Sequence, residues 1–279
     1  MSTLPYRLGL PAWAFPGWKG RYFAPDVPML RSYASVFNAV EGNTTFYRIP
    51  DPGTVDAWRD AVAGRDFRFC FKLPRTVTHE RRPDTGDLHR FLRAIEPLGD
   101  YLGPLFVQLP AKVGPRDLPH LHALLERLPS DRRIVIEVRD HRFFEEPGLL
   151  VPLIDAFDLG RVVLDSRPLY EGDRTHPDVL TALHEKPDLP VLPEVYNGIE
   201  FVRLILHPDM ASNERYIEEW APRIAASVRD GVDSYMMIHC PNNLHCPPLA
   251  EQFHTALGRE LDGTPPLEPW SVPQQAQLL

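Results

Sequence analysis

The sequence has few cysteines and no long run of apolar residues. Its three cysteines, Cys70, Cys240 and Cys246, are a sparse, odd-numbered set that does not resemble a disulfide framework. Residues 1–10, MSTLPYRLGL, lack the charged segment and long apolar run of a secretory leader. No window approaches the ~20 apolar residues that a bilayer-spanning helix needs. We therefore expect a cytoplasmic protein without a membrane partner.

An excess of positive charge is also missing. Lys and Arg number 30 against 38 Asp and Glu, which gives a formal net charge of -8 at pH 7. Such a balance gives no general attraction to nucleic acid, so this partner is not favoured, although a local basic patch is compatible with it. The sequence contains no G-x-G-x-x-G, G-x-x-x-x-G-K-[ST], H-E-x-x-H or C-x-x-C motif, so no nucleotide cofactor is predicted. The sequence leaves the oligomeric state open.

What the chain does contain is a regular alternation of short apolar runs and amphipathic stretches. The eight expected strands are residues 6–12, 38–47, 67–74, 103–110, 133–140, 161–166, 200–207 and 234–241. Helical patterns with apolar residues at i, i+3 and i+4 follow most of them, as in Ile217, Trp220, Ala221 and Ile224. Strand–helix units in strict alternation imply a parallel sheet, and eight of them imply a single closed (β/α)8 TIM-barrel-like domain. The alternative is a doubly wound open parallel sheet.

The predicted domain covers residues 1–265, and residues 266–279 form a C-terminal tail. Residues from about Ser166 to Gly198 are the least regular part of the chain, with many prolines and one short helical pattern. We expect this segment to be a long loop on the active face of the barrel.

Polar residues lie at the ends of seven consecutive strands, where barrels place their functional groups. They are Glu41, Asn43, Tyr47, Lys72, Gln108, Glu137, Arg139, Asp165, Arg203, His207, His239, Asn242 and Asn243. In the stretch VEGNTTFY, a strand period of two places Glu41, Asn43 and Tyr47 on one side, which we expect to face the upper interior of the barrel. Ionisable groups inside a barrel are costly unless paired, so the set predicts a ligand site. The alternative is a network of structural ion pairs between its acids and its Lys and Arg residues.

The stretch KLPRTVTHERR, residues 72–82, is a second candidate for binding. It contains Lys72, Arg75, Arg81, Arg82 and His79 but only one acid. Arg holds phosphate or carboxylate through two parallel hydrogen bonds, so the loop suits a small anion. The alternative is a solvated loop. Near the first strand, Trp13 and the aromatic residues at 18, 22 and 23 would either line a pocket and stack on a ring or belong to the core.

Several of these residues also suit metal or proton chemistry. HCPNNLHCP contains His239 and Cys240, but its spacing is not a recognised zinc pattern. Glu137, Asp165 and His239 are candidate ligands of a catalytic divalent metal. Without a metal, Glu41 or Glu137 would be a general base, and Lys72 would stabilise negative charge or form a Schiff base.

Five motifs resemble the YecE-like proteins, domain-of-unknown-function family 72. They are LGLPAWAFPGWKGRYFAP, FNAVEGNTTFYRIP, FRFCFKLPRTVTHERR, IVIEVRD and MMIHCPNNLHCP. The resemblance covers nearly the whole chain and implies a TIM-barrel-like fold in a bacterial-type cytoplasmic protein, with no assigned reaction. Through it, the family's recurring polar positions correspond to Trp13, Glu41, Asn43, Tyr47, Lys72, His79, Glu80, Glu137 and Arg139. The opening LPAW departs from the TSGW-like form of the family.

The sequence as a whole predicts an enzyme acting on a small or nucleotide-like anionic substrate by hydrolase, lyase or isomerase chemistry. The expected catalytic residues are Glu41, Lys72, Glu137, Asp165 and His239. Those expected to bind the substrate are Trp13, Asn43, Tyr47, Arg75, His79, Gln108, Arg139, Arg203, His207, Asn242 and Asn243. One alternative is a non-catalytic barrel that binds a metabolite or nucleic acid, and another is a divalent-metal-dependent nuclease or sugar isomerase.

Overall fold

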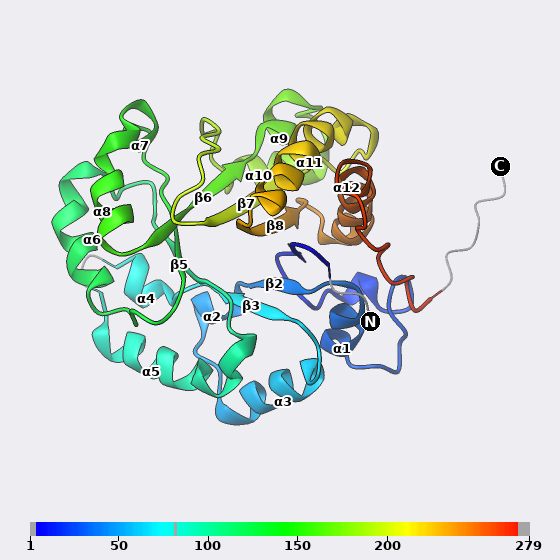
Figure 1. Ribbon diagram of the computed structural model, residues 1–279, viewed down its shortest axis with the longest axis horizontal. Coiled ribbons are helices and arrows are strands. Elements are labelled where there is room, and N and C mark those ends of the chain that lie inside the picture. Colours follow the sequence, from blue (N-terminus) through cyan, green and yellow to red (C-terminus); the bar gives the residue numbers. More distant parts are fainter. Residues whose placement is uncertain (1–3, 81–82, 273–279) are drawn as a thin grey trace.

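The computed structural model describes residues 4–80 and 83–272 (Figure 1). This part of the chain contains eight strands, all in parallel pairs. They are β1 (Arg7–Gly9), β2 (Ala39–Gly42), β3 (Arg68–Phe71), β4 (Leu105–Gln108), β5 (Ile134–Glu137), β6 (Leu159–Asp165), β7 (Ile199–Ile205) and β8 (Asp233–His239). Each lies within or next to an apolar run that predicted a strand.

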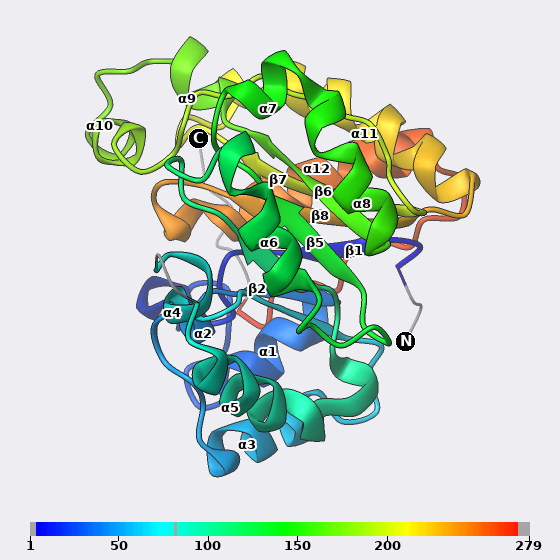
Figure 2. The same cartoon turned by 90° about the vertical axis from the view of Figure 1, so that its left-hand side faces the viewer.

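Helices connect the strands and lie on the outer side of the sheets (Figures 1 and 2). The α-helices are α1 (Met29–Val36), α2 (Thr44–Tyr47), α3 (Pro52–Val62), α4 (Arg75–Thr78), α5 (Thr85–Ile95), α6 (Leu118–Leu125), α7 (Arg142–Glu145), α8 (Val151–Ala156), α9 (Arg167–Glu171), α10 (Pro177–Leu183), α11 (Glu214–Arg229) and α12 (Cys246–Glu260). Short 3-10 helices are η1 (Pro16–Trp18), η2 (Glu96–Tyr101), η3 (Pro115–Asp117), η4 (Pro147–Leu149), η5 (Ala211–Asn213) and η6 (Asn243–His245). The start of α3 follows directly from the sequence, because the Asp51 carboxylate accepts a 2.9 Å hydrogen bond from Thr54 N and Pro52 occupies the first turn.

The eight strands do not form one continuous ladder. Six of them form a curled sheet in the order β1-β8-β7-β6-β5-β4, while β2 and β3 pair separately. The closed eight-stranded barrel predicted from the sequence is therefore corrected to a half-barrel with a separate strand pair, and the alternative of an open parallel sheet fits the six-stranded part. In Figure 1, β2 and β3 lie across the molecule from β6, β7 and β8.

No regular ladder joins β1 to β2 or β3 to β4, where the strands are only three or four residues long. Isolated contacts cross these seams instead. Glu41 N donates to Leu10 O at 3.0 Å between the β1 and β2 segments, and Leu73 N donates to Phe106 O at 3.0 Å between β3 and β4. The two sheets thus remain in contact at both edges without a regular ladder.

Apolar side chains fill the space between the sheets. This buried cluster takes Ala39 and Cys70 from the two-stranded sheet and Phe106, Val135, Val162, Ile199, Phe201, Tyr235 and Met237 from the six-stranded sheet. The rings of Phe201 and Tyr235 stack with centroids 5.5 Å apart. The space between the sheets is therefore packed by these side chains.

One predicted strand ends earlier than its pattern suggested. VEGNTTFY was expected to continue as a strand to Tyr47, but β2 ends at Gly42 and the next residues form α2. The Thr45 hydroxyl donates to Gly42 O at 2.9 Å and to Lys72 O at 2.7 Å. Such local side-chain bonds to the backbone compete with strand pairing, and they stop the alternation after Gly42. As a result Glu41 is buried, while Tyr47 turns outward and is 81 % exposed.

The remaining segments pack on this framework. The predicted apolar face of α11 is confirmed, because Ile217, Trp220 and Ile224 are buried. Trp270, beyond the last helix, contacts Tyr22 with ring centroids 5.4 Å apart. In the described part of the chain, no helix combines the length and apolarity required to cross a bilayer.

Gly9 marks the close approach of β1 and β2, and it gives a direct test of this seam. A Cβ at Gly9 would lie 2.6 Å from Ala39 O and 2.8 Å from the sulfur of Met237. We expect Gly9→Ala to force the strands apart and to lower the free energy of unfolding by about 1–3 kcal/mol in urea titrations. The matched control is Gly148→Ala, because nothing lies within 4 Å of the added carbon there. Equal stability of both variants would contradict the close packing at the seam.

Candidate functional site

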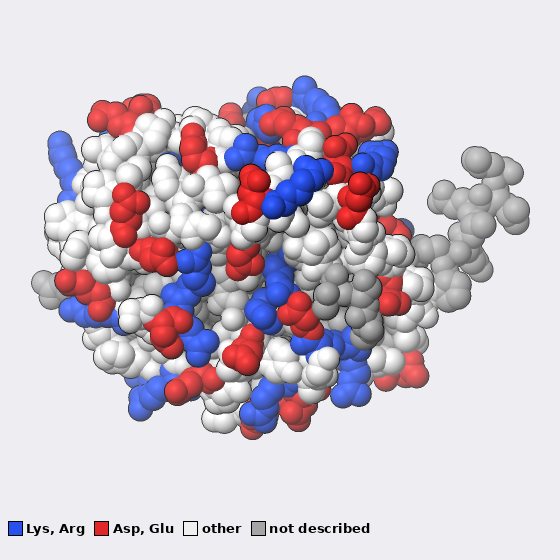
Figure 3. Space-filling model, viewed as in Figure 1, with Lys and Arg blue, Asp and Glu red and all other residues white. Residues whose placement is uncertain are grey.

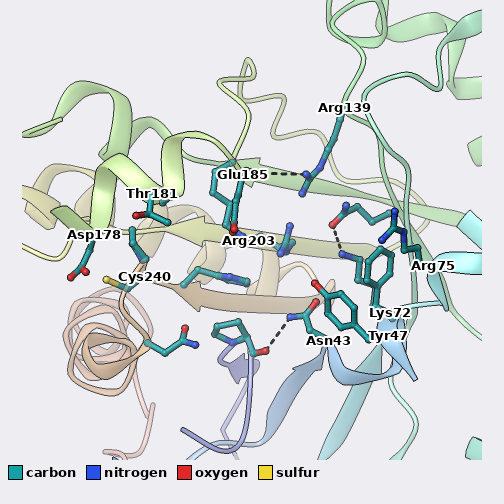
Figure 4. A pocket seen from close by; sticks show the side chains of 18 of the residues that line it. Asn43, Tyr47, Lys72, Arg75, Arg139, Asp178, Thr181, Glu185, Arg203 and Cys240 are labelled. Atoms are coloured by element: carbon teal, nitrogen blue, oxygen red, sulfur yellow. Dashed lines mark hydrogen bonds between the residues drawn. The ribbon is translucent and has the colours of Figure 1, made fainter. Parts of the chain in front are cut away.

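A cavity of about 730 Å³ opens beyond the carboxyl ends of the strands. Its lining residues are Pro11, Asn43, Phe46, Tyr47, Lys72, Arg75, His79, Gln108, Arg139, Asp178, Thr181, Ala182, Glu185, Lys186, Arg203, His239, Cys240, Pro241 and Asn243. Figure 4 shows Lys72 and Arg75 on one side of this space, with Asp178 and Thr181 on the opposite side. Ten residues predicted to form the site therefore line one cavity.

The guanidinium group of Arg203 is the central charged group. Arg203 lies on β7 and is 2 % exposed. Its Nε and Nη2 donate to the two carboxylate oxygens of Glu41, at 2.8 and 2.9 Å. Its Nη1 donates to Glu137 Oε2 at 2.6 Å. Glu41 lies in β2 of the two-stranded sheet, and Glu137 is the last residue of β5 in the six-stranded sheet. One arginine therefore joins the strand ends of both sheets.

These ion pairs set the charge of both acids. Burial tends to raise the pKa of each carboxyl group, but the nearby guanidinium of Arg203 outweighs it. The pKa of Glu41 is held well below its usual value, and that of Glu137 falls to about 2. Both are carboxylates at neutral pH and accept hydrogen bonds from Arg203. The structural ion-pair alternative therefore describes this part of the site.

His239, at the end of β8, lines the cavity next to Glu41. Its Nε2 lies 3.0 Å from Glu41 Oε2. Since that carboxylate is ionised, we assign the ring hydrogen to Nε2, which leaves the lone pair on Nδ1. Burial lowers the pKa of His239 to about 4, although Glu41 acts in the opposite direction. The imidazole is thus neutral at pH 7, and Glu41 fixes its tautomer.

Two lysines add positive charge to the cavity. Lys72 Nζ donates to Gln108 Oε1 at 2.7 Å and lies 4.1 Å from the centre of the Phe46 ring. Lys186 comes from the turn after α10. Burial, followed by the charge of Arg203, lowers the pKa of each lysine to about 8. Within residues 4–80 and 83–272, neither ammonium group forms an ion pair with a carboxylate.

The rim carries further groups that were predicted to bind a substrate. Arg139 Nε donates to Glu137 Oε1 at 2.7 Å, and Asn43 Nδ2 donates to Glu41 Oε1 at 2.8 Å. Burial and the neighbouring Lys72 lower the pKa of His79 to about 4, so it is neutral at pH 7. Arg75, Gln108, Tyr47 and Asn243 complete the predicted residues that line the cavity.

Six predicted residues are not among the lining residues: Glu41 and Glu137, which are buried beside Arg203, and four others. Asp165 accepts hydrogen bonds from Arg167 and, at 2.8 Å, from Trp220 Nε1. His207 accepts at Nδ1 from Asp209 N. Trp13 packs edge-on against Trp58. Asn242 donates to Asp178 Oδ2 at 3.2 Å and caps η6.

The set of metal ligands suggested by the sequence is not assembled. Asp165 is paired with Arg167, and Glu137 is paired with Arg203 and Arg139. Over the described ranges, no three His, Cys, Asp or Glu side chains are grouped so as to hold a metal ion. Arg81 and Arg82 of the basic motif lie outside the described residues.

Sequence reasoning missed the contribution of α10 and its following turn. This segment supplies Asp178, Thr181, Ala182, Glu185 and Lys186 to the lining. The irregular stretch 166–198 was expected to be a loop on the active face, but no residue within it was singled out as a binding group. The signal available was Lys186 itself, a lysine in a proline-rich stretch of a chain that uses arginine for most of its positive charges.

Removal of Arg203 tests whether the buried ion pairs stabilise the protein. Arg203→Met leaves two buried carboxylates without their main partner, so we expect the free energy of unfolding at pH 7 to fall by about 3–5 kcal/mol. Acidification to pH 5 should recover part of this loss, because burial without Arg203 raises the carboxyl pKa values and the acids take up protons. Urea titrations measure both effects. The control is Arg59→Met, which breaks an exposed pair with Asp56 and should cost less than about 1 kcal/mol. A loss no larger than that of the control would contradict a stabilising role.

The neutral state of His239 predicts a pH dependence of stability. Its pKa falls from 6.5 to about 4 in the folded protein, so its contribution is present above pH 6.5 and is lost as the pH falls toward about 4. We expect the free energy of unfolding of the wild type to decrease as the pH falls from 6.5 to about 4. That of the His239→Gln variant should decrease less steeply over the same range. His79, whose pKa is also lowered to about 4, contributes to the slope that remains, as do His245 and His254, whose pKa values burial also lowers. His120→Gln alters an exposed histidine and should keep the wild-type slope. Identical slopes for all three proteins would show that His239 is not held neutral.

Known proteins resemble this chain in sequence and in fold. A family model described as "Protein of unknown function DUF72" matches residues 7–275. The UPF0759 protein YecE of Escherichia coli K12 is 34% identical, over 97% of this chain and 98% of its own length. Among solved structures, a DUF72 family protein from Enterococcus faecalis V583 has a TM-score of 0.68 at 18% identity and covers 94% of this chain and 99% of its own. One from Thermotoga maritima has a TM-score of 0.65 at 21% identity, with 90% and 98% covered. The chain therefore belongs to the DUF72 family.

Proposed function

We propose that this protein is an enzyme that binds a small anionic substrate in the cavity and acts on it by proton transfer. The observation that carries the proposal is the pair of lysines, Lys72 and Lys186, which line the cavity without a carboxylate partner in the described part of the chain. A phosphate or carboxylate group suits such a site. We also propose that the two sheets act together as one barrel mouth, since isolated backbone contacts join them at both seams.

The distribution of charge supports an anionic ligand. The two buried acids, Glu41 and Glu137, are already matched by Arg203 and Arg139. The ammonium groups of the two lysines therefore add positive charge that no buried acid neutralises. A buried charge without a partner is costly, and an anion bound beside Lys72 would remove that cost.

The size and rim of the cavity indicate the kind of substrate. A volume of about 730 Å³ suits a sugar phosphate or a mononucleotide. Tyr47 is largely exposed at the rim, and its ring packs edge-on against Phe46. An exposed ring at this position could stack on a planar or sugar ring of the substrate.

The charge pattern supports a small molecule over nucleic acid. Figure 3 shows acidic and basic side chains interspersed over one face of the molecule. The net charge of -8 adds no general attraction to a phosphate backbone. The positive charge that matters for binding is local to the cavity.

The roles proposed for the side chains follow from which of them still have a free hydrogen-bond donor, acceptor or lone pair. Glu41 and Glu137 are held as carboxylates by Arg203, so they position other groups. His239 retains a lone pair on Nδ1 and would accept a proton from the substrate or from water. Lys72 would stabilise the negative charge that develops. Hydrolase, lyase and isomerase reactions all use such a combination.

Sulfate tests the anion site, because its charge is constant across the pH range of interest. We expect calorimetric titration to show sulfate binding at pH 7, weakened at least tenfold by Lys72→Met. Binding should also weaken as the pH rises through about 8, where Lys72 and Lys186 lose their protons. The control is Lys19→Met, since Lys19 is exposed and lies outside the cavity.

Compounds that compete with sulfate should then be assayed for turnover. We expect His239→Gln to abolish turnover while the compounds still bind. No sulfate binding, or equal binding by the Lys72→Met and Lys19→Met variants, would refute the anion site. Full turnover by His239→Gln would refute the role of the imidazole.

A further inference from the structure

The use of lysine in this chain is selective. Lys and Arg number 30, but only four are lysines, at positions 19, 72, 112 and 186. Lys19 and Lys112 are exposed, whereas Lys72 and Lys186 line the same cavity. Arginine supplies the buried charge elsewhere, as at Arg203. An amine can lose its proton and act as a nucleophile, which a guanidinium does not do near neutral pH. The cavity lysines therefore point to chemistry that needs an amine.

The two cavity lysines differ in their surroundings. The Nζ of Lys72 already has partners, because it donates to the Gln108 amide oxygen at 2.7 Å and lies over the face of Phe46. The Nζ of Lys186 has no hydrogen bond or ion pair with any residue of the described ranges. Burial, followed by the charge of Arg203, lowers the pKa of Lys186 to about 8, as it does that of Lys72, so the unpartnered Nζ is what distinguishes Lys186. Lys186 is the better nucleophile.

The backbone of Lys186 is nevertheless firmly positioned. Its carbonyl oxygen accepts from the Tyr170 hydroxyl at 2.5 Å, and Pro187 O accepts from the Ser166 hydroxyl at 2.7 Å. Its N–H donates to Ala182 O at 2.8 Å. Ser166 directly follows β6, so a strand end anchors the turn that carries this lysine. The turn is fixed while the amine stays unpartnered, as a nucleophile requires.

We propose that Lys186 forms an imine with the aldehyde or ketone carbon of the anionic substrate. The lone pair of the amine attacks the carbonyl carbon, and a C–N bond forms. The carbonyl oxygen then leaves as water with the two hydrogens of the amine, which gives C=N; water reverses the step to release the product. The inference rests on the proposed function, since Lys72 and Arg139 would hold the anionic group. It narrows the substrate class to 2-oxo acids and phosphorylated aldehydes or ketones.

Reductive trapping of the full-length protein tests this assignment. The protein is incubated with glyoxylate, pyruvate, glyceraldehyde 3-phosphate or dihydroxyacetone phosphate in the presence of cyanoborohydride, and its intact mass and peptides are then measured. We expect a single adduct with the mass of the carbonyl compound less one oxygen atom, located on Lys186. Lys186→Arg keeps the charge but cannot form the imine, so trapping should fall at least tenfold. Lys112→Arg changes an exposed lysine and should be trapped as the wild type is.

The outcomes separate this inference from the proposed function. An adduct on Lys72, or equal labelling of all four lysines, would overturn the assignment to Lys186. Sulfate binding without trapping of any of the four compounds would overturn the imine and leave the anion site standing. Absence of both sulfate binding and trapping would overturn both proposals. A circular dichroism spectrum of Lys186→Arg that matches the wild type shows that loss of trapping is not loss of fold.

Discussion

Arg203 crosses the interior of the molecule near the ends of the strands, and its guanidinium group contacts carboxylates from both sheets. Glu41 belongs to the two-stranded sheet and Glu137 to the six-stranded one, so their pairing with β7 holds together strands that no continuous ladder joins. Buried charges are tolerated only when paired in good geometry, and this requirement fixes the strand ends relative to one another. The same two carboxylates then orient His239, Asn43 and Arg139. The cavity therefore takes its shape from one buried ionic network.

The ionic network also separates the polar residues that are already paired from those that line the cavity. Below it, the interior is filled by rings such as Phe106 and Phe201, so no substrate can enter further. Within it, each carboxylate already accepts hydrogen bonds from arginine. The cavity above the network is lined by polar groups that include the two lysines and His239. In the proposed function, the buried ion pairs have a structural role and these lining groups bind and react.

Strands and most helices could be predicted from the sequence, because apolar periodicity and capping residues act locally. The hydrogen-bond partners that distant strands and helices provide for the strand-end acids could not be predicted. Glu137 and Asp165 both end a strand and both have an arginine two positions later, with which each pairs. Only the fold shows that Arg203 also donates to Glu137 and that Trp220 donates to Asp165. The interruptions of the strand ladder and the position of Lys186 in the cavity were not predicted for the same reason. Both depend on contacts between segments that are distant in the chain.

The arrangement of charges also constrains how a substrate lies in the cavity. An anionic group placed beside Lys186 or His239 would raise the pKa of both, so the amine and the imidazole would become protonated and lose their lone pairs. An anionic group beside Lys72 and Arg139 would favour the charged form of both, and Gln108 and Glu137 already accept hydrogen bonds from them. Lys186 and His239 line the same cavity, so in the proposed reaction a neutral carbonyl carbon there would have a nucleophile and a proton acceptor available. If the proposed imine forms, the substrate would therefore lie in one orientation, with its anionic group toward β3 and β5 and its reacting carbon toward β8 and the α10 turn.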